Sequence, residues 1–151
     1  MNLTEHFKLI EFTRSATASA RKIDNSLNPA NPNDAEAISN LKHLCEEVLE
    51  PLRQHVGKPV LIGSGYRCPK LNKAVGGVTN SQHMTGEAAD IHLYSIEEGK
   101  QWLTWIMENC TFDQLLWERE SPTSCHFWIH VSCRKDHSKN RHQVRNIVKH
   151  K

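Results

Sequence analysis

Long hydrophobic runs are missing from this chain of 151 residues. No apolar stretch approaches the roughly 20 residues that a helix needs to cross a bilayer, so we expect no membrane insertion. The beginning, MNLTEHFKLIEFTRSATASARK, has charged residues between its apolar pairs and lacks the continuous apolar core of a secretory signal. We therefore expect no signal peptide and synthesis in the cytoplasm.

Cysteine is present in a number and spacing that exclude two common frameworks. The five cysteines are an odd number and contain no C-x-x-C pair, which argues against a disulfide scaffold and against a zinc knuckle. We expect reduced thiols at all five positions, which are Cys45, Cys68, Cys110, Cys125 and Cys133.

Charge is balanced overall but uneven along the chain. The net charge is +2, and residues 134–151 carry seven Lys/Arg against one Asp, or +6, which leaves −4 for residues 1–133. A basic end favours anionic partners, but the acidic remainder argues against a nucleic-acid binder. Length and an ordinary hydrophobic content of 38% predict a single domain over 1–151, with a basic C-terminal strand and tail from about 134.

Hydrophobic periodicity predicts an α+β domain. The first long helix should begin at Asn33 or Asp34, be kinked or split at Pro51 and end at Gly57. A capping box at Ser95 opens another helix. The helical patterns cover 34–56, 69–77 and 96–109, and the strand patterns cover 59–67, 87–93, 112–118, 126–132 and, more weakly, 142–148. This order implies a small antiparallel or mixed sheet with helices packed on one face.

Two of the predicted strands and one loop carry metal-binding residue types. Strand alternation puts Asp90 and His92 on one face of 87–93, and Trp128 and His130 on one face of 126–132. If these strands are neighbours, Asp90 and His130 converge, and the loop before Asp90 can bring His83 beside them. Catalytic zinc commonly has three protein ligands and one open position. Taken alone, the seven-residue spacing of His83 and Asp90 also fits a loop histidine and a strand aspartate that bind no metal. His92, on the same strand face as Asp90, is a competing candidate for the ligand.

Four stretches carry a resemblance to a known family: SGYR (64–67), LNKAVGG (71–77), SQHMTGEAAD (81–90) and WIHV (128–131). They resemble the zinc D-alanyl-D-alanine carboxypeptidases, which are peptidoglycan peptidases of the hedgehog/DD-peptidase fold. The resemblance covers most of the chain. It implies a zinc peptidase that hydrolyses amide bonds of peptidoglycan stem peptides with zinc-activated water. It also implies that one Zn²⁺ ion is held by His83, Asp90 and His130. We expect the protein to be a monomer.

The same resemblance suggests residues that bind substrate. Arg67 matches the family arginine near the substrate carbonyl, where a guanidinium can bind a carboxylate or stabilise an oxyanion. Ser81 lies in the motif before His83, and Tyr66 and Trp128 are candidates for the pocket wall. Ordinary packing is the alternative for Tyr66 and Trp128, and a surface salt bridge is the alternative for Arg67.

The general base is where the sequence departs from the family pattern. Many relatives have an acidic residue three positions before the last histidine, but this chain has Phe127 there. Glu118, on the preceding strand, is the replacement candidate, since a hairpin can direct it toward the metal site. His126 could instead steady a tetrahedral intermediate. The weaker candidates for the base are Glu87, Asp113 and Glu120.

Two questions remain open at this stage. Because the general base is uncertain, an alternative to an enzyme stays open. In this alternative the protein is a non-catalytic cell-wall or protein binding module that retains the metal. Absence of a signal and of a cell-wall-binding domain fits an endolysin-like enzyme released by a phage or attached to a virion, and it also fits a cytoplasmic protein.

Overall fold

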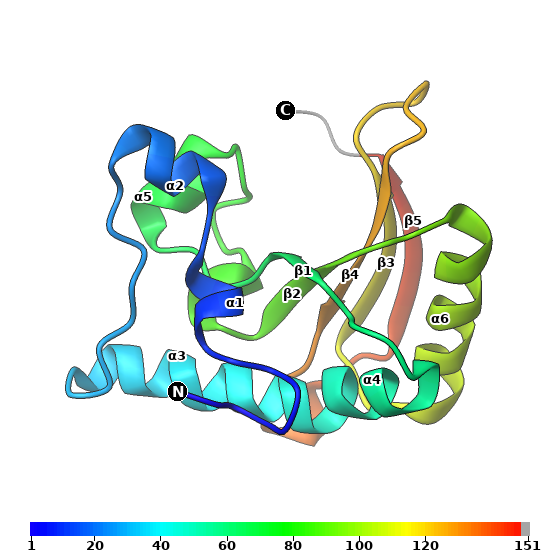
Figure 1. Cartoon of the computed structure of the whole chain (residues 1–151), viewed down its shortest axis with the longest axis horizontal. Coiled ribbons are helices and arrows are strands. Elements are labelled where there is room, and N and C mark those ends of the chain that lie inside the picture. The colour runs from blue at the N-terminus through cyan, green and yellow to red at the C-terminus, as the bar shows by residue number, and fades with distance from the viewer. Residues whose placement is uncertain (149–151) are drawn as a thin grey trace.

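The computed structural model describes residues 1–148 and contains a five-stranded mixed sheet of strand order β1-β2-β4-β3-β5 (Figure 1). Neighbouring strands are antiparallel except β3 and β5, which are parallel. The strands are β1 (Ile62–Ser64), β2 (Ala88–His92), β3 (Gln114–Arg119), β4 (Phe127–Ser132) and β5 (Gln143–Val148). The predicted α+β class and the short strand within 142–148 are confirmed, whereas the tail residues 149–151 lie outside the described residues.

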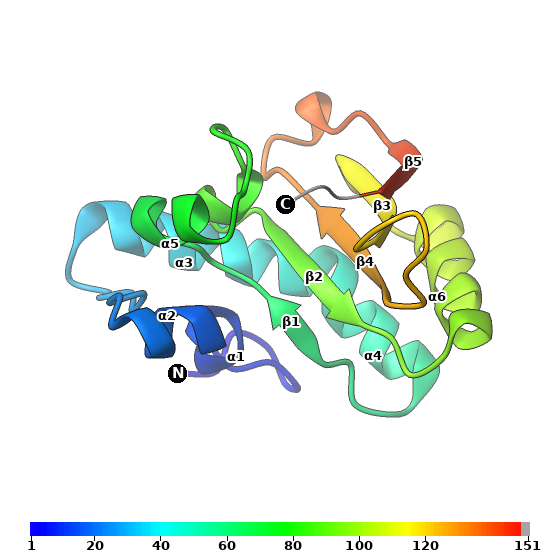
Figure 2. The same ribbon diagram turned by 90° about the horizontal axis from the view of Figure 1, so that it is seen from above.

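The helices form two groups, and α3 runs beneath both the sheet and the helices beyond β1, as Figures 1 and 2 show. The first group packs its apolar side on the sheet and consists of α3 (Pro32–Leu44), the π-helical turn η1 (Cys45–Leu49), α4 (Glu50–Val56) and α6 (Ile96–Asn109). The second group lies beyond β1 and consists of α1 (Ile10–Thr13), α2 (Ala16–Arg21), α5 (Pro69–Ala74) and the 3₁₀ turn η2 (Gln82–Thr85). A further 3₁₀ turn, η3 (His137–Lys139), precedes β5. Within residues 1–148, no helix has the length and apolar content required to span a membrane.

Pro51 shapes the long helix, as predicted, but it does so without breaking it. Proline lacks an N–H and its ring clashes with the carbonyl four residues earlier. The chain widens into η1 just before Pro51, where the Glu50 N–H donates to Cys45 O, and α4 then continues to Gly57 at φ 68°. The helix start was predicted wrongly. Asn31 is the N-cap, because its side chain accepts from the N–H groups of Asn33 and Asp34 and Pro32 occupies the first turn.

The strand predicted over 59–67 is limited to Ile62–Ser64. The chain leaves the sheet at Gly65, which lies so close to α1 that a Cβ there would meet Phe12 Cα at 2.6 Å. The next N–H, of Tyr66, donates to Phe12 O at 2.7 Å instead of to a strand. Neither α1 nor α2 was predicted from the sequence, and contact with α1 is what ends the strand.

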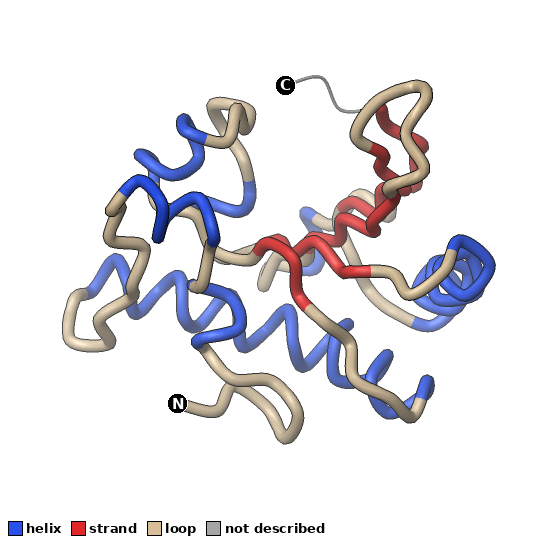
Figure 3. Tube along the Cα trace, turned by 45° about the horizontal axis from the view of Figure 1, so that its top comes forward, coloured by secondary structure: helices blue, strands red, loops and turns tan. Residues whose placement is uncertain are grey.

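The two faces of the sheet have different chemistry. Ile91, Ile129 and Val131 are fully buried against the helices of the first group. Because successive side chains of a strand point to opposite faces, Asp90 and His130 point to the other face. Figure 3 shows the strands (red) in the middle of the molecule with helices around them. The polar residues of the cleft gather on this second face.

Candidate metal centre

Strand register brings Asp90 and His130 together. The two residues are direct partners in the antiparallel β2–β4 ladder, so their side chains leave the sheet side by side. Nδ1 of His130 lies 3.0 Å from Oδ1 of Asp90. Both side chains are buried, with total residue exposures of 8% each.

His83 reaches the same point from outside the sheet. It lies in η2, within a segment predicted as a loop, and Ser81 caps this turn by accepting from the His83 N–H at 3.2 Å. Nδ1 of His83 lies 2.7 Å from the carbonyl oxygen of Gly65, which makes Nδ1 the protonated nitrogen. Nε2 is thereby left as an acceptor, 3.4 Å from Asp90 Oδ1 and buried, and it has no hydrogen-bond partner among residues 1–148.

The protonation states at this cluster suit metal binding. Burial lowers the pKa of His83 below its usual value, despite the nearby Asp90, and so favours the neutral imidazole. Burial alone would raise the pKa of Asp90, but His83 and His130 outweigh it and hold that pKa well below the usual range. A neutral imidazole and an ionised carboxylate are the forms that bind a metal.

The donor set fits a zinc ion. One atom each from His83, Asp90 and His130 can be chosen so that all lie within 4.8 Å of one another. Two imidazole nitrogens and one carboxylate oxygen are a common set for catalytic zinc. The buried Nε2 of His83 costs free energy unless something satisfies it, and a cation between these three side chains would do so.

Arg67 is held beside the cluster by the residues of its neighbouring motif. Its guanidinium lies 3.6 Å from Asp90 Oδ2, and it donates to Ser64 Oγ at 3.1 Å and to Asn72 Oδ1 at 3.3 Å. Burial lowers the pKa of Arg67 somewhat, against the attraction of Asp90 and Glu118. Since an arginine stays protonated at neutral pH, a fixed positive charge lies next to the cluster.

Glu118 also lies at the cluster. It is an inner residue of β3, 2% exposed, and its Oε1 is 3.9 Å from His130 Nδ1. Trp128, its direct partner in the β3–β4 ladder, donates from Nε1 to the same oxygen at 3.0 Å. A carboxylate at this distance from a metal-ligand atom can reach a water molecule between them.

A cleft of about 570 Å³ opens over these residues. One wall comes from the segment between α5 and η2 and includes Gly77 and Ser81, and the sheet contributes Leu116 and Glu118. Arg134 and Arg141, from the segment after β4, also line this cleft. The cleft therefore combines the candidate metal cluster with a basic rim that suits an extended substrate carrying carboxylates.

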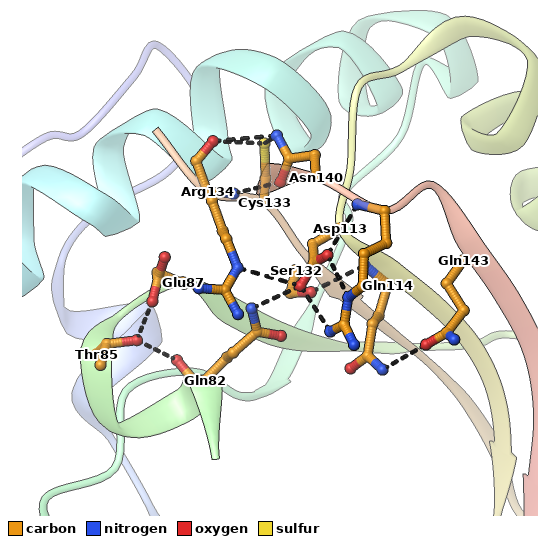
Figure 4. Close-up of polar contacts among 11 residues, drawn as sticks. Gln82, Thr85, Glu87, Asp113, Gln114, Ser132, Cys133, Arg134, Asn140 and Gln143 are labelled. Carbon is orange, nitrogen blue, oxygen red and sulfur yellow. Dashed lines mark hydrogen bonds and ion pairs between the residues drawn. The ribbon is translucent and has the colours of Figure 1, made fainter. Parts of the chain in front are cut away.

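A buried aspartate ties the walls of the cleft together (Figure 4). Asp113 is fully buried and pairs with Arg141 through two hydrogen bonds of 2.8 and 2.9 Å. It also accepts from Gln82 at 2.9 Å, beside His83, and lies 3.4 Å from Arg134. Sequence reasoning considered Asp113 only as a weak proton-transfer candidate. Its partners are 21 to 31 residues away along the chain, so no local pattern could reveal this role.

The other predicted residues lie outside this cleft. Tyr66 is half-buried and lines a neighbouring hollow that Arg67 shares. His126 is exposed, with Nδ1 3.9 Å from Glu120 Oε2 and its ring against Trp128. His92 is exposed and contacts Tyr94. All five cysteines are free thiols, and Cys68 acts as the N-cap of α5.

Comparison with known proteins agrees with these motifs. The family model of peptidase M15 matches residues 5–132, which is most of the chain. A zinc D-Ala-D-Ala carboxypeptidase of Streptomyces albus G is 43% identical over 44 residues, an alignment that covers 28% of this chain and 17% of that protein. The matched segment is thus a small part of the Streptomyces protein, and the family assignment depends on the longer match. The chain belongs to the peptidase M15 family.

Proposed function

We propose that this protein is a zinc peptidase that hydrolyses amide bonds in peptidoglycan stem peptides, as a D,D-carboxypeptidase or endopeptidase, on a hedgehog/DD-peptidase fold. The observation that carries the proposal is the buried Nε2 of His83, which faces Asp90 beside His130 and has no hydrogen-bond partner in the described part of the chain. Membership of the peptidase M15 family and the similarity to a zinc D-Ala-D-Ala carboxypeptidase support it.

In this proposal one zinc ion is held by His83 Nε2, a carboxylate oxygen of Asp90 and His130 Nδ1. When bound, zinc supplies Lewis acidity, which polarises the substrate carbonyl and makes water more acidic. The carbonyl of Gly65 keeps the ring of His83 in the required tautomer through Nδ1.

Glu118 moves the proton. Its carboxylate accepts a proton from the attacking water and delivers it to the leaving amine, and Trp128 holds the carboxylate in place for both transfers. Arg67 stabilises the negative charge that develops on the substrate oxygen, or binds a substrate carboxylate. Ser81 borders the substrate path in the cleft, whereas any contact from Tyr66, Trp128 or His126 requires a substrate that extends beyond it.

The test is digestion of purified peptidoglycan by the zinc-loaded protein, followed by mass spectrometry of the muropeptides. Loss of a terminal D-alanine identifies a carboxypeptidase, and loss of cross-linked dimers identifies an endopeptidase. The matched control is His92→Ala, which removes an exposed histidine from β2 and should leave the products unchanged. Unchanged muropeptides from a fully zinc-loaded protein would refute the proposal in favour of a binding module.

A further inference from the structure

A second cluster of metal-binding side chains lies apart from the residues of the cleft. It consists of His43 from α3, Cys133 just after β4 and His137 from η3, and one donor atom of each lies within 4.8 Å of the others. None of the three lines the cleft. The lack of a C-x-x-C pair argues against a zinc knuckle, but here the donors come from segments about 90 residues apart in the chain.

The two imidazoles have the separation that shared metal binding requires. Nε2 of His43 and Nε2 of His137 lie 3.2 Å apart, with ring centroids 5.2 Å apart. Two nitrogens at about 2.0–2.1 Å from a tetrahedral zinc ion are about 3.3 Å from each other. A single N–H···N hydrogen bond also gives this distance, but it explains neither the thiol nor the carboxylate beside the pair.

Cys133 supplies the soft donor. Its side chain is buried, with the residue 1% exposed, and Nδ2 of Asn140 lies 3.8 Å from its sulfur (Figure 4). Hydrogen-bond donors directed at a cysteine sulfur are typical partners of a metal-bound thiolate. The buried thiol and its amide neighbour therefore resemble a ligand with its supporting contact.

Glu47 offers a fourth donor. It follows His43 by four residues on the same helical face, and its Oε1 lies 3.8 Å from Nε2 of His137. His43, Cys133 and His137 give three donors that lie close together, and Glu47, beside His137, is the candidate for a fourth. Two imidazoles, one thiolate and one carboxylate would leave no open position for water, as in a structural zinc site.

We propose that His43, Cys133 and His137, completed by Glu47, bind a second divalent metal ion of the zinc type. The ion fastens the segment that follows β4 to α3, next to the contacts of Lys135 with Glu36 and Ser39. This segment carries Arg134 and Arg141 to the cleft. The inference is independent of the proposed peptidase activity.

Cobalt is the probe, because a thiolate bound to Co²⁺ gives a sulfur-to-metal charge-transfer band that imidazole and carboxylate ligands do not give. The metal-free full chain is titrated with Co²⁺ under reducing conditions, and bound cobalt is counted after desalting. We expect two ions per chain and a charge-transfer band. Cys133→Ser should abolish the band and leave one ion, whereas Cys125→Ser, at an exposed position, should change neither.

Two further variants keep the result interpretable if Cys133→Ser folds poorly. His137→Ala changes a side chain that is 48% exposed and should weaken binding at the thiolate site by about tenfold or more. His83→Ala should remove one ion while the band persists, which separates this site from the cleft. One bound cobalt without a band in the parent protein, or a band that survives Cys133→Ser, would overturn the proposal.

Discussion

Trp128 and Glu118 face each other across the β3–β4 ladder, and Nε1 of the indole donates a 3.0 Å hydrogen bond to the Glu118 carboxylate. This bond fixes a buried carboxylate 3.9 Å from His130 Nδ1. The position three residues before His130, where many relatives have an acidic residue, is occupied by Phe127. A neighbouring strand thus provides a carboxylate at the cluster that β4 itself does not provide.

Replacing Glu118 by Gln should reduce peptidoglycan hydrolysis by about 10²–10⁴-fold, because an amide cannot take up the proton while its oxygen can still accept from Trp128. Zinc content, measured by elemental analysis, should stay at the parent level. Glu120→Gln, at a largely exposed neighbour, is the matched control and should retain activity. Full activity in Glu118→Gln would remove Glu118 from the mechanism.

Zinc retention should depend on His83 and not on His92. His83→Ala removes one of three buried donors, and we expect the protein to lose this zinc on dialysis and to lose the stabilisation that a bound ligand gives. His92→Ala changes an exposed side chain on β2, and this variant should keep both the zinc ion and the stabilisation that zinc gives. The measurements are zinc per chain and the thermal midpoint with and without added zinc. Equal zinc content in the two variants would contradict the proposed ligand set.

Gly77 should be intolerant of a side chain. A Cβ at this position would lie 2.0 Å from Asn72 Oδ1 and 3.0 Å from NH1 of Arg67, which are the two atoms that bond each other. Gly77→Ala should cost about 1–3 kcal/mol of stability and lower kcat/KM by displacing Arg67. Gly63→Ala is the control, since its Cβ would make only an ordinary contact at 3.8 Å. Parent-like kinetics in Gly77→Ala would show that Arg67 does not need this support.

Asp113 should contribute to stability in a pH-dependent way. Burial would raise its pKa, but the hydrogen bonds from Arg141 and Gln82 dominate and depress it strongly. A carboxylate with a depressed folded-state pKa adds its full stability above its unfolded pKa of about 3.9. This stability is lost progressively as the pH falls from there toward the strongly depressed folded-state pKa.

Asp113→Asn should therefore lower the free energy of unfolding by about 1–3 kcal/mol at pH 7 and by a smaller amount at pH 3, where part of the stabilisation is already lost. Urea unfolding at the two pH values measures the difference, and Glu46→Gln, at an exposed position on η1, serves as the control. An equal loss at both pH values would mean that the ionised carboxylate is not the stabilising form.

Local signals in the sequence were sufficient for most of the elements. Ser95 caps α6 as predicted, with its side chain accepting from the Glu98 N–H, and α6 covers Ile96–Asn109. The Glu98 carboxylate of the predicted capping box instead accepts from Lys58 Nζ. The alternation in β2 and β4 assigned the correct faces to Asp90 and His130. Each of these signals acts within a few residues, through a cap or a two-residue period, and is therefore readable from the chain alone.

Other features depend on contacts between distant segments. The strand predicted to reach residue 67 ends at Ser64 because α1 approaches Gly65. The cap of α3 is Asn31, earlier than predicted, because the Asn31 side chain accepts from two N–H groups. The orientation of Glu118 follows from register, since a shift of one residue would have pointed it into the core.

By itself the sequence determined the residue types of the cleft, the motif around His83 and the faces of the strands, because these depend on short-range patterns. Only the tertiary structure decided that Asp113 joins Gln82 to Arg141, and that Cys133 lies close to His43 and His137. Strand order and the packing of loops on helices set those distances. The strand order and the loop packing result from the burial of one shared core. No single segment of the chain therefore specifies these distances.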